Sequence, residues 1–179
     1  MNQMYGFEGE VKHKYNSDLM MSFTNLFNNL PLAYLIDQQV FVVHGGLSST
    51  DTTIEDIKNI KRVCQPPDQV MSDLLWSDPQ VCEGVGESKR GVGIQFGPDV
   101  TKRFLETNQL RYIIRSHEVK EKGYDIEHDS ACITIFSAPN YWFVGLVMLV
   151  TLWAIWGRIL HSHTMISVLS FLLSLLWWE

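Results

Sequence analysis

The sequence predicts a mixed α+β fold, in which helices flank a mixed sheet, followed by an apolar helical tail. Apolar runs of strand length recur along residues 1–141, between stretches with the periodicity of helices. These strands and helices do not alternate regularly, which favours a mixed sheet over a parallel doubly wound one. Of the 14 basic and 20 acidic side chains, only Arg158 and Glu179 lie in residues 142–179. We therefore expect two parts, residues 1–141 and residues 142–179.

Composition narrows the classes of function. The chain has 179 residues, enough for one domain with a core, and its formal net charge is −6. The basic stripes of a nucleic-acid-binding protein are absent from the sequence, so we expect no nucleic-acid partner. The three cysteines, Cys64, Cys82 and Cys132, have no CxxC or zinc-finger spacing. They favour reduced thiols in a cytoplasmic or nuclear protein.

The N-terminal third predicts two helices and a hairpin. Residues 5–14 carry alternating charges that suit a short helix. Ser17 is the expected cap of a second helix, which Pro31 ends. Its apolar side chains follow helical spacing and predict a stripe packed on a core: Phe23, Leu26, Phe27 and Leu30. Ala33–Ile36 and Val40–Val43 flank a polar turn and predict the hairpin.

The following elements are less regular. Residues 80–90 are polar and contain glycine, so we expect an exposed loop there. The helices predicted after the hairpin span residues 54–60, Val70–Trp76 and a stretch that begins at Pro98. The further predicted strands are Val92–Phe96, Arg111–Arg115, residues 124–127 and residues 131–136.

Two histidines share one setting, the end of an apolar strand. His44, with Gly45-Gly46 after it, follows Val40–Val43, and His117 follows Arg111–Arg115. A single histidine of this kind is more often a hydrogen-bonded structural residue than a metal ligand. The repeated placement favours the interpretation as a pair of metal ligands.

Several further motifs, taken in order, resemble the C-terminal half of the catalytic domain of the metal-dependent phosphoprotein phosphatases, a family of serine/threonine protein phosphatases. The resemblance covers residues 4–141 and is strongest to the type 5 members. The matching motifs are Tyr5-Gly6-Phe7, His44-Gly45-Gly46-Leu47, Asp73-Leu74-Leu75-Trp76-Ser77-Asp78-Pro79, Arg90-Gly91-Val92, Phe96-Gly97, Arg115-Ser116-His117-Glu118-Val119 and Ser137-Ala138-Pro139-Asn140-Tyr141.

The resemblance implies a metallophosphoesterase-type β-sandwich flanked by helices, with two divalent metal ions (Mn, or Fe and Zn). In that family a metal-bridging hydroxide attacks the phosphorus of phosphoserine or phosphothreonine in proteins. His44 and His117 resemble the histidine ligands of the second metal ion. Arg90 resembles an arginine that grips the phosphate. Tyr5 and Tyr141 resemble tyrosines of the substrate groove, and Asp78 an acidic residue near it.

Each of these residues also has an ordinary structural interpretation. Arg90 alone suits a solvated loop charge, and Asp78 can simply begin the turn at Pro79. Tyr5 and Tyr141 suit half-buried aromatic residues, and Trp76 is interpreted as structural.

The resemblance also implies missing parts. The family motifs GDxHG, GDxVDRG and GNHE do not occur in the sequence. They would supply the remaining metal ligands and the proton-donating histidine, so we expect the chain to retain no proton donor and to be inactive alone. We expect the chaperone-recruiting domain of the type 5 enzymes to be absent as well. A fragment or truncated isoform of a phosphatase, a non-catalytic membrane-associated interaction protein and a mis-spliced product without a stable fold remain alternatives.

The tail begins at Trp142. Residues 142–160 contain one charged side chain, Arg158, and a second apolar run covers residues 165–178. The first run is close to the roughly 20 residues that cross a bilayer. Membrane association through transmembrane or interfacial helices is one interpretation. A non-native tail from a changed reading frame or a retained intron is the other.

Overall fold

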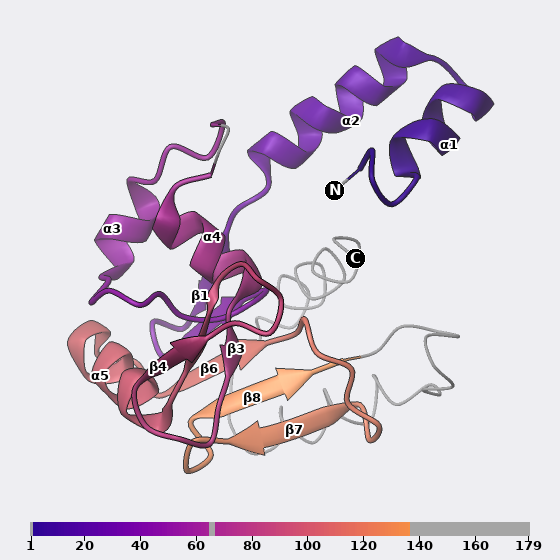
Figure 1. The fold of residues 1–179 in the computed structure, drawn as a ribbon. Coiled ribbons are helices and arrows are strands. Elements are labelled where there is room, and N and C mark those ends of the chain that lie inside the picture. Colours follow the sequence, from indigo (N-terminus) through magenta and orange to yellow (C-terminus); the bar gives the residue numbers. More distant parts are fainter. Residues whose placement is uncertain (1, 65–66, 137–179) are drawn as a thin grey trace. The chain divides into compact units, whose positions relative to one another are not determined.

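The computed structural model describes residues 2–64 and 67–136, and it divides the chain into two compact units (Figure 1). Of the described residues, 2–31 and 61–64 form the smaller unit, and 32–60 and 67–136 form the larger one. Within the described ranges, no helix combines the length and the apolar character needed to cross a bilayer. The tail predicted over residues 142–179 lies outside these ranges, so its interpretation stays a prediction.

Two helices form the smaller unit, α1 (Phe7–Lys14) and α2 (Ser17–Asn29). Acidic side chains in the first turn of α1 and basic ones in its last turn complement the helix dipole. The cap of α2 is Asn16, whose side chain accepts a hydrogen bond from the Leu19 amide at 2.8 Å. The prediction of Ser17 as the cap is therefore wrong by one residue, because Asn16 offers an equally good acceptor one position earlier.

The apolar stripe of α2 packs against α1. The rings of Phe23 and Phe27 lie 5.3 and 5.8 Å from the ring of Phe7, measured between centroids. Leu26, expected in the same stripe, is 55% exposed. The prediction that the whole stripe is buried on a core is thus wrong for Leu26.

A five-stranded sheet organises the larger unit, in the order β1-β2-β6-β8-β7. Its strands are β1 (Ala33–Ile36), β2 (Val40–Val43), β6 (Tyr112–Arg115), β7 (Tyr124–Glu127) and β8 (Cys132–Ile135). The central strands β2, β6 and β8 are parallel neighbours, whereas β1 and β7 pair antiparallel at the edges. The predicted hairpin is confirmed, and its turn places Asp37 and Gln38 at positive φ, as a tight two-residue turn requires.

A second sheet has three strands, in the order β3-β5-β4. The family resemblance implied a β-sandwich, but the sequence pattern predicted only one strand of this sheet, over Val92–Phe96. The sheet consists of β3 (Asp78–Pro79), β4 (Val85–Glu87) and β5 (Ile94–Phe96). The prediction of residues 80–90 as a loop is wrong where β4 pairs antiparallel with β5. Its sequence, Val-Gly-Glu, has no apolar alternation, so the strand is stabilised by pairing rather than by a buried face.

Three helices complete the larger unit: α3 (Ile54–Lys58), α4 (Gln69–Trp76) and α5 (Pro98–Asn108). The predicted start of α3 is confirmed, since Thr53 and Asp56 form a capping box. Pro98 occupies the first turn of α5, also as predicted.

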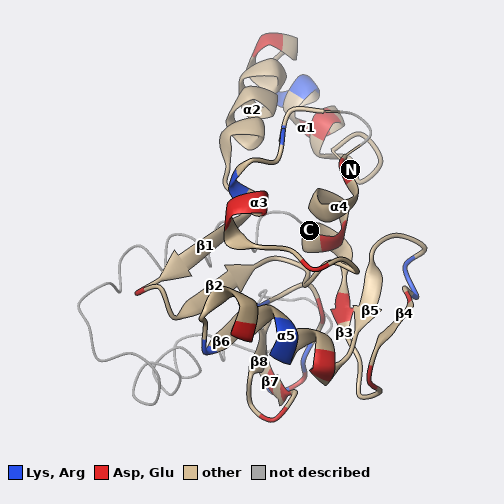
Figure 2. Cartoon of the chain, turned by 90° about the vertical axis from the view of Figure 1, so that its left-hand side faces the viewer, with Lys and Arg blue, Asp and Glu red and all other residues tan. Residues whose placement is uncertain are grey.

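One core joins both sheets with α4 and α5. Its buried side chains come from β2, β5, β6, β8 and the two helices: Phe41, Val43, Phe96, Ile113, Cys132, Leu74, Val100, Phe104 and Leu105. Strands β1, β2 and β5 carry no charged residue (Figure 2). Among the central strands the charged residue is Arg115, the last residue of β6. The α+β class with mixed sheets and helices is confirmed.

Candidate functional site

The candidate site begins at two parallel strand ends. His44 directly follows β2, and His117 lies two residues beyond β6. Because β2 and β6 are parallel neighbours, with Val42 opposite Ile114, both histidines emerge at the same edge of the sheet. His44 Nε2 and His117 Nδ1 are 3.1 Å apart, and both side chains are buried. The structure thus brings the two predicted ligands together.

Tight backbone contacts set the position of His44. The amides of Gly45 and Gly46 both donate to the carbonyl oxygen of Leu74, at 2.9 and 3.3 Å. A Cβ atom on Gly45 would lie 2.5 Å from the carbonyl carbon of Leu75. This close approach of backbone to backbone requires glycine and pins the turn after His44 against the end of α4.

His117 lies at the tip of a three-residue turn. The Glu118 amide donates to the Ser116 carbonyl oxygen at 2.9 Å, and the φ of His117 is 69°. This γ-turn with positive φ is rare and strained for a residue with a side chain. The Ser116 amide donates to the His44 carbonyl oxygen at 3.1 Å, which ties the two histidine-bearing turns to each other.

Both the burial and the charges around His44 favour its neutral form. Burial lowers the pKa of His44 to about 3, and the nearby His117, Arg115 and Arg90 act in the same direction. His44 Nδ1 is buried and has no hydrogen-bond partner among the described residues. A neutral imidazole with an uncommitted nitrogen is the form that binds a metal ion.

Arg90 is presented by the hairpin that joins β4 to β5. The Gly91 amide donates to the Ser88 carbonyl oxygen at 3.2 Å and closes a turn around Arg90. Arg90 Nε donates to Asp78 Oδ2 at 2.7 Å, and its Nη2 donates to the His117 carbonyl oxygen at 3.0 Å. The small sheet therefore places a guanidinium beside the histidine pair.

Asp78 is shared by two arginines. Its Oδ1 accepts from Arg115 Nη2 at 2.8 Å, while its Oδ2 accepts from Arg90 Nε. Burial by itself would raise the pKa of Asp78. The hydrogen bond from Arg90 and the charges of Arg115 and Arg90 outweigh burial, so the pKa is lowered. Asp78 is consequently ionised at neutral pH and holds the two arginines.

The roles predicted for two tyrosines are not tested by the described residues. Tyr5 belongs to the smaller unit, where it is 69% exposed. Tyr141 lies outside the described residues. The roles expected for Tyr5 and Tyr141 in a substrate groove stay predictions.

Three residues near the histidines were not singled out for this role from the sequence. The ring of Trp76 meets the ring of His117 edge-on at 5.5 Å between centroids. Asp73 accepts hydrogen bonds from Ser48 Oγ at 2.9 Å and from the Ser49 amide at 3.2 Å, and so holds the chain that follows His44. Arg115 was quoted only within a motif. A charge that directly follows two isoleucines in a strand was the available signal, because such a charge must be paired when buried.

The described residues do not fit a complete dinuclear metal centre. His44 and His117 fit two ligands of one ion, but no group of three or more histidine, cysteine, aspartate or glutamate side chains suited to a metal occurs in the described part. Asp78, the carboxylate beside them, has its oxygens engaged by Arg90 and Arg115. A hard ion such as Mn²⁺ prefers oxygen ligands, so two imidazoles are a poor site for it.

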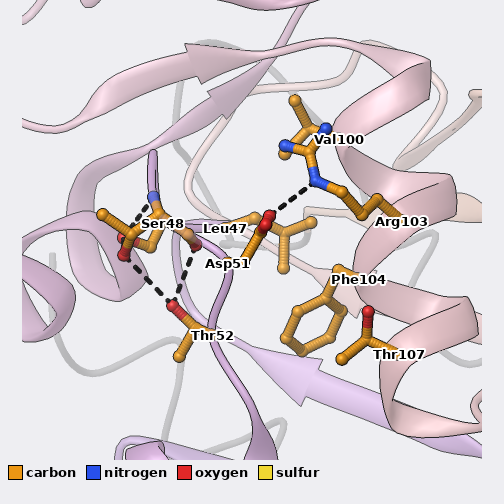
Figure 3. Close-up of a pocket in the computed structure, with 9 residues that line it drawn as sticks. Leu47, Ser48, Asp51, Thr52, Val100, Arg103, Phe104 and Thr107 are labelled. Carbon is orange, nitrogen blue, oxygen red and sulfur yellow. Dashed lines mark hydrogen bonds and ion pairs between the residues drawn. The ribbon is translucent and has the colours of Figure 1, made fainter.

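A separate pocket lies between α5 and the chain after Gly46 (Figure 3). It is lined by Ser48, Thr52 and Phe104, among others, and Arg103 Nε reaches Asp51 Oδ1 at 2.6 Å at its edge. The histidine pair and Arg90 are not among its lining residues. The pocket thus belongs to the support of the loop after His44 rather than to the candidate site.

Comparison with known proteins shows to which family the chain is similar. The family model of the calcineurin-like phosphoesterases matches residues 2–121. Serine/threonine-protein phosphatase 5 of Rattus norvegicus is 59% identical over 143 residues, which are 79% of this chain and 29% of that protein. Serine/threonine-protein phosphatase T of Trypanosoma brucei brucei is 54% identical over 144 residues, which are 79% of this chain and 30% of that protein.

A solved structure of a protein serine/threonine phosphatase from Saccharomyces cerevisiae is similar with a TM-score of 0.74 and 49% identity, over 79% of this chain and 45% of that one. The chain spans less than a third of the length of the rat and trypanosome relatives. The predicted resemblance to type 5 phosphatases is confirmed by these relatives. The family model matches about two thirds of this chain, so the chain belongs to the calcineurin-like phosphoesterase family.

Proposed function

We propose that this chain provides part of the active site of a protein serine/threonine phosphatase, which hydrolyses phosphoserine and phosphothreonine in proteins. In this proposal Arg90 binds the phosphoryl group of the substrate. His44 and His117 are two ligands of one divalent ion of a dinuclear centre. The substrate class follows from the names of the relatives, which are serine/threonine-protein phosphatases.

The observation that carries the proposal is the position of Arg90. Its side chain is 33% exposed, and its guanidinium donates to the carbonyl oxygen of His117, one of the two buried histidines. A planar guanidinium can bind two oxygens of a phosphoryl group at once. Asp78 orients this guanidinium from the side, because it accepts from Arg90 Nε at 2.7 Å.

We also propose that the purified chain has no measurable phosphatase turnover alone. Two neutral imidazoles supply too few ligands to hold a hard divalent ion, so the described residues cannot assemble the nucleophile. We therefore expect this chain to bind phosphate through Arg90 but not to turn over a phosphorylated substrate.

Phosphate titration and phosphopeptide turnover test the two statements. Inorganic phosphate should bind the chain, and Arg90→Ala should weaken binding by about tenfold, the worth of one charge-assisted pair. Arg111→Ala removes an exposed arginine that donates to Gln39 Oε1 and is the matched control. Equal phosphate affinity in Arg90→Ala and wild type would refute the role of Arg90. Turnover of a phosphopeptide with added Mn²⁺ that His117→Ala abolishes would refute the proposed inactivity.

A second candidate function is a non-catalytic interaction protein attached to a membrane. The observation that favours it is the sequence of residues 142–160, in which Arg158 is the one charged side chain. Carbonate extraction of cell membranes decides it, since a protein inserted through this segment stays in the pellet. Recovery in the soluble fraction would leave the cytoplasmic or nuclear location that the family resemblance implies.

A further inference from the structure

Arg115 is a fully buried arginine at the end of a central strand. Its side chain is 0% exposed, whereas Arg90 is 33% exposed. The guanidinium of Arg115 donates to Asp78 Oδ1 at 2.8 Å and to Glu118 Oε2 at 2.5 Å. Arg115 Nε also donates to the carbonyl oxygen of Gly45. With two carboxylates to compensate its charge, Arg115 is stable in a place that no substrate can reach.

Each of these partners adjoins a residue of the candidate site. Gly45 directly follows His44, and Glu118 directly follows His117. Asp78 holds Arg90. One guanidinium therefore contacts the chain beside both histidines and the carboxylate that orients the proposed phosphate-binding arginine.

We propose that Arg115 is a positioning residue that fixes Arg90 through Asp78. Asp78 cannot move with Arg90, because its Oδ1 accepts from Arg115. Arg115 is in turn anchored by Glu118. The guanidinium of Arg90 is consequently held in one orientation beside His117. The functional part of this inference rests on the proposed phosphate binding by Arg90.

Lysine does not replace Arg115 in this role. The guanidinium directs donors to Asp78, Glu118 and the Gly45 carbonyl oxygen at the same time. A lysine ammonium is a compact point charge on a flexible stem, and it lacks the planar fork that spans these partners. The geometry of the network, rather than its positive charge alone, is what Arg115 contributes.

The test compares Arg115→Lys and Arg115→Met with the control Arg111→Met in the full chain. The Nε–Hε resonance of Arg90, observed by ¹⁵N NMR, reports its hydrogen bond to Asp78 separately from stability. We expect this resonance to move toward that of a solvated arginine in both Arg115 variants, while Arg111→Met leaves it in place. Inorganic phosphate should bind both Arg115 variants about tenfold more weakly, because a misplaced binding group loses most of its advantage.

An unchanged Arg90 resonance in folded Arg115→Lys or Arg115→Met would overturn the inference. If both variants unfold, Glu118→Gln makes the same test, since it removes the charge that anchors Arg115 from the opposite side. A shifted Arg90 resonance in Glu118→Gln supports the inference, and an unchanged one overturns it. Failure of the wild-type chain to bind phosphate would refute the proposed function, while the Arg90 resonance would still decide the role of Arg115.

Discussion

The two sheets of the larger unit are stabilised in different ways. The five-stranded sheet has central strands buried on both faces, as the uninterrupted apolar sequence of β2 shows. The three-stranded sheet has strands of two or three residues, and only β5 contributes to the core, through Phe96. The large sheet therefore carries its own packing energy, whereas the small sheet depends on what it is attached to.

The candidate site is divided between these sheets in the same way. The large sheet provides His44 and His117, and the small sheet provides Asp78 and Arg90. Arg115 belongs to the large sheet and binds the small one at Asp78. A weakly packed sheet can thus hold a side chain such as Arg90 in place when a buried charge network attaches it to a stable sheet.

The largest expected effect comes from breaking that attachment at Asp78. Asp78→Ala removes one of the two carboxylates that compensate buried Arg115, so the free energy of unfolding should fall by about 3 kcal/mol. Urea unfolding followed by circular dichroism measures it. Asp125→Ala, which removes an exposed partner of Lys120, is the control and should stay close to wild type. A loss below about 1 kcal/mol in Asp78→Ala would show that the network does not hold the sheets together.

The same carboxylate predicts a dependence on pH. The pKa of Asp78 is lowered in the folded state, so its contribution is complete above the unfolded value of about 4 and is lost as the pH falls through the lower folded value. The free energy of unfolding of wild type should therefore decline below about pH 4 more steeply than that of Asp78→Asn. Parallel curves for the two proteins in this range would contradict the account.

Gly45→Ala should have the next largest effect. The added Cβ would lie 2.5 Å from the carbonyl carbon of Leu75, and backbone cannot move aside as a flexible side chain can. We expect the free energy of unfolding to fall by about 2 kcal/mol, a typical cost of overpacking. Gly9→Ala is the control, because a Cβ there would meet nothing within 4 Å. Equal thermal stability of the two variants would contradict the close approach of this turn to α4.

A second link between the sheets predicts a smaller effect. His128 lies in the turn between β7 and β8. Its Nδ1 is 2.7 Å from Thr101 Oγ1 of α5, and its Nε2 is 2.9 Å from the carbonyl oxygen of Gln80. His128→Ala leaves both partners without this side chain and should lower the free energy of unfolding by about 1–2 kcal/mol. His13→Ala, which removes an exposed histidine of α1, serves as the control. Native-state hydrogen exchange should then accelerate in β3 and β5 before it does in β2, and the opposite order would contradict a link to the small sheet.

The ion pair at the pocket edge should matter least. Arg103 and Asp51 are both largely exposed, at 47% and 73% of their side chains, so water already screens them. Arg103→Ala should change the free energy of unfolding by no more than about 0.5 kcal/mol. A loss as large as that expected for His128→Ala would contradict the screening of this exposed ion pair by water.

Sequence reasoning succeeded where the chain's own periodicity decides the structure. The β1–β2 hairpin, the start of α3 at residue 54 and the proline at the start of α5 follow from local rules and are confirmed. Strand β4 was not predicted, because Val-Gly-Glu has no apolar pattern of its own and its partner β5 lies across a loop. Asn16 was not predicted as the cap of α2, because the neighbouring Ser17 is nearly as good an acceptor.

The site was predictable only in part for a related reason. His44 and His117 each have a local signal, a histidine at the end of an apolar strand, and parallel pairing of their strands brings them together. The partners of Arg115 come from segments far apart in the sequence, such as Gly45 and Asp78. Only the packing of the two sheets reveals that this one side chain contacts them all.

A double-mutant cycle between Arg115 and Asp78 tests the central claim most directly. The free energies of unfolding of wild type, Arg115→Met, Asp78→Ala and the double variant give the coupling between the two side chains. The account predicts a coupling of about 2 kcal/mol or more, because each side chain is the compensating charge of the other across the two sheets. A coupling below about 0.5 kcal/mol, with the two losses simply additive, would contradict the claim that this pair attaches the small sheet to the large one.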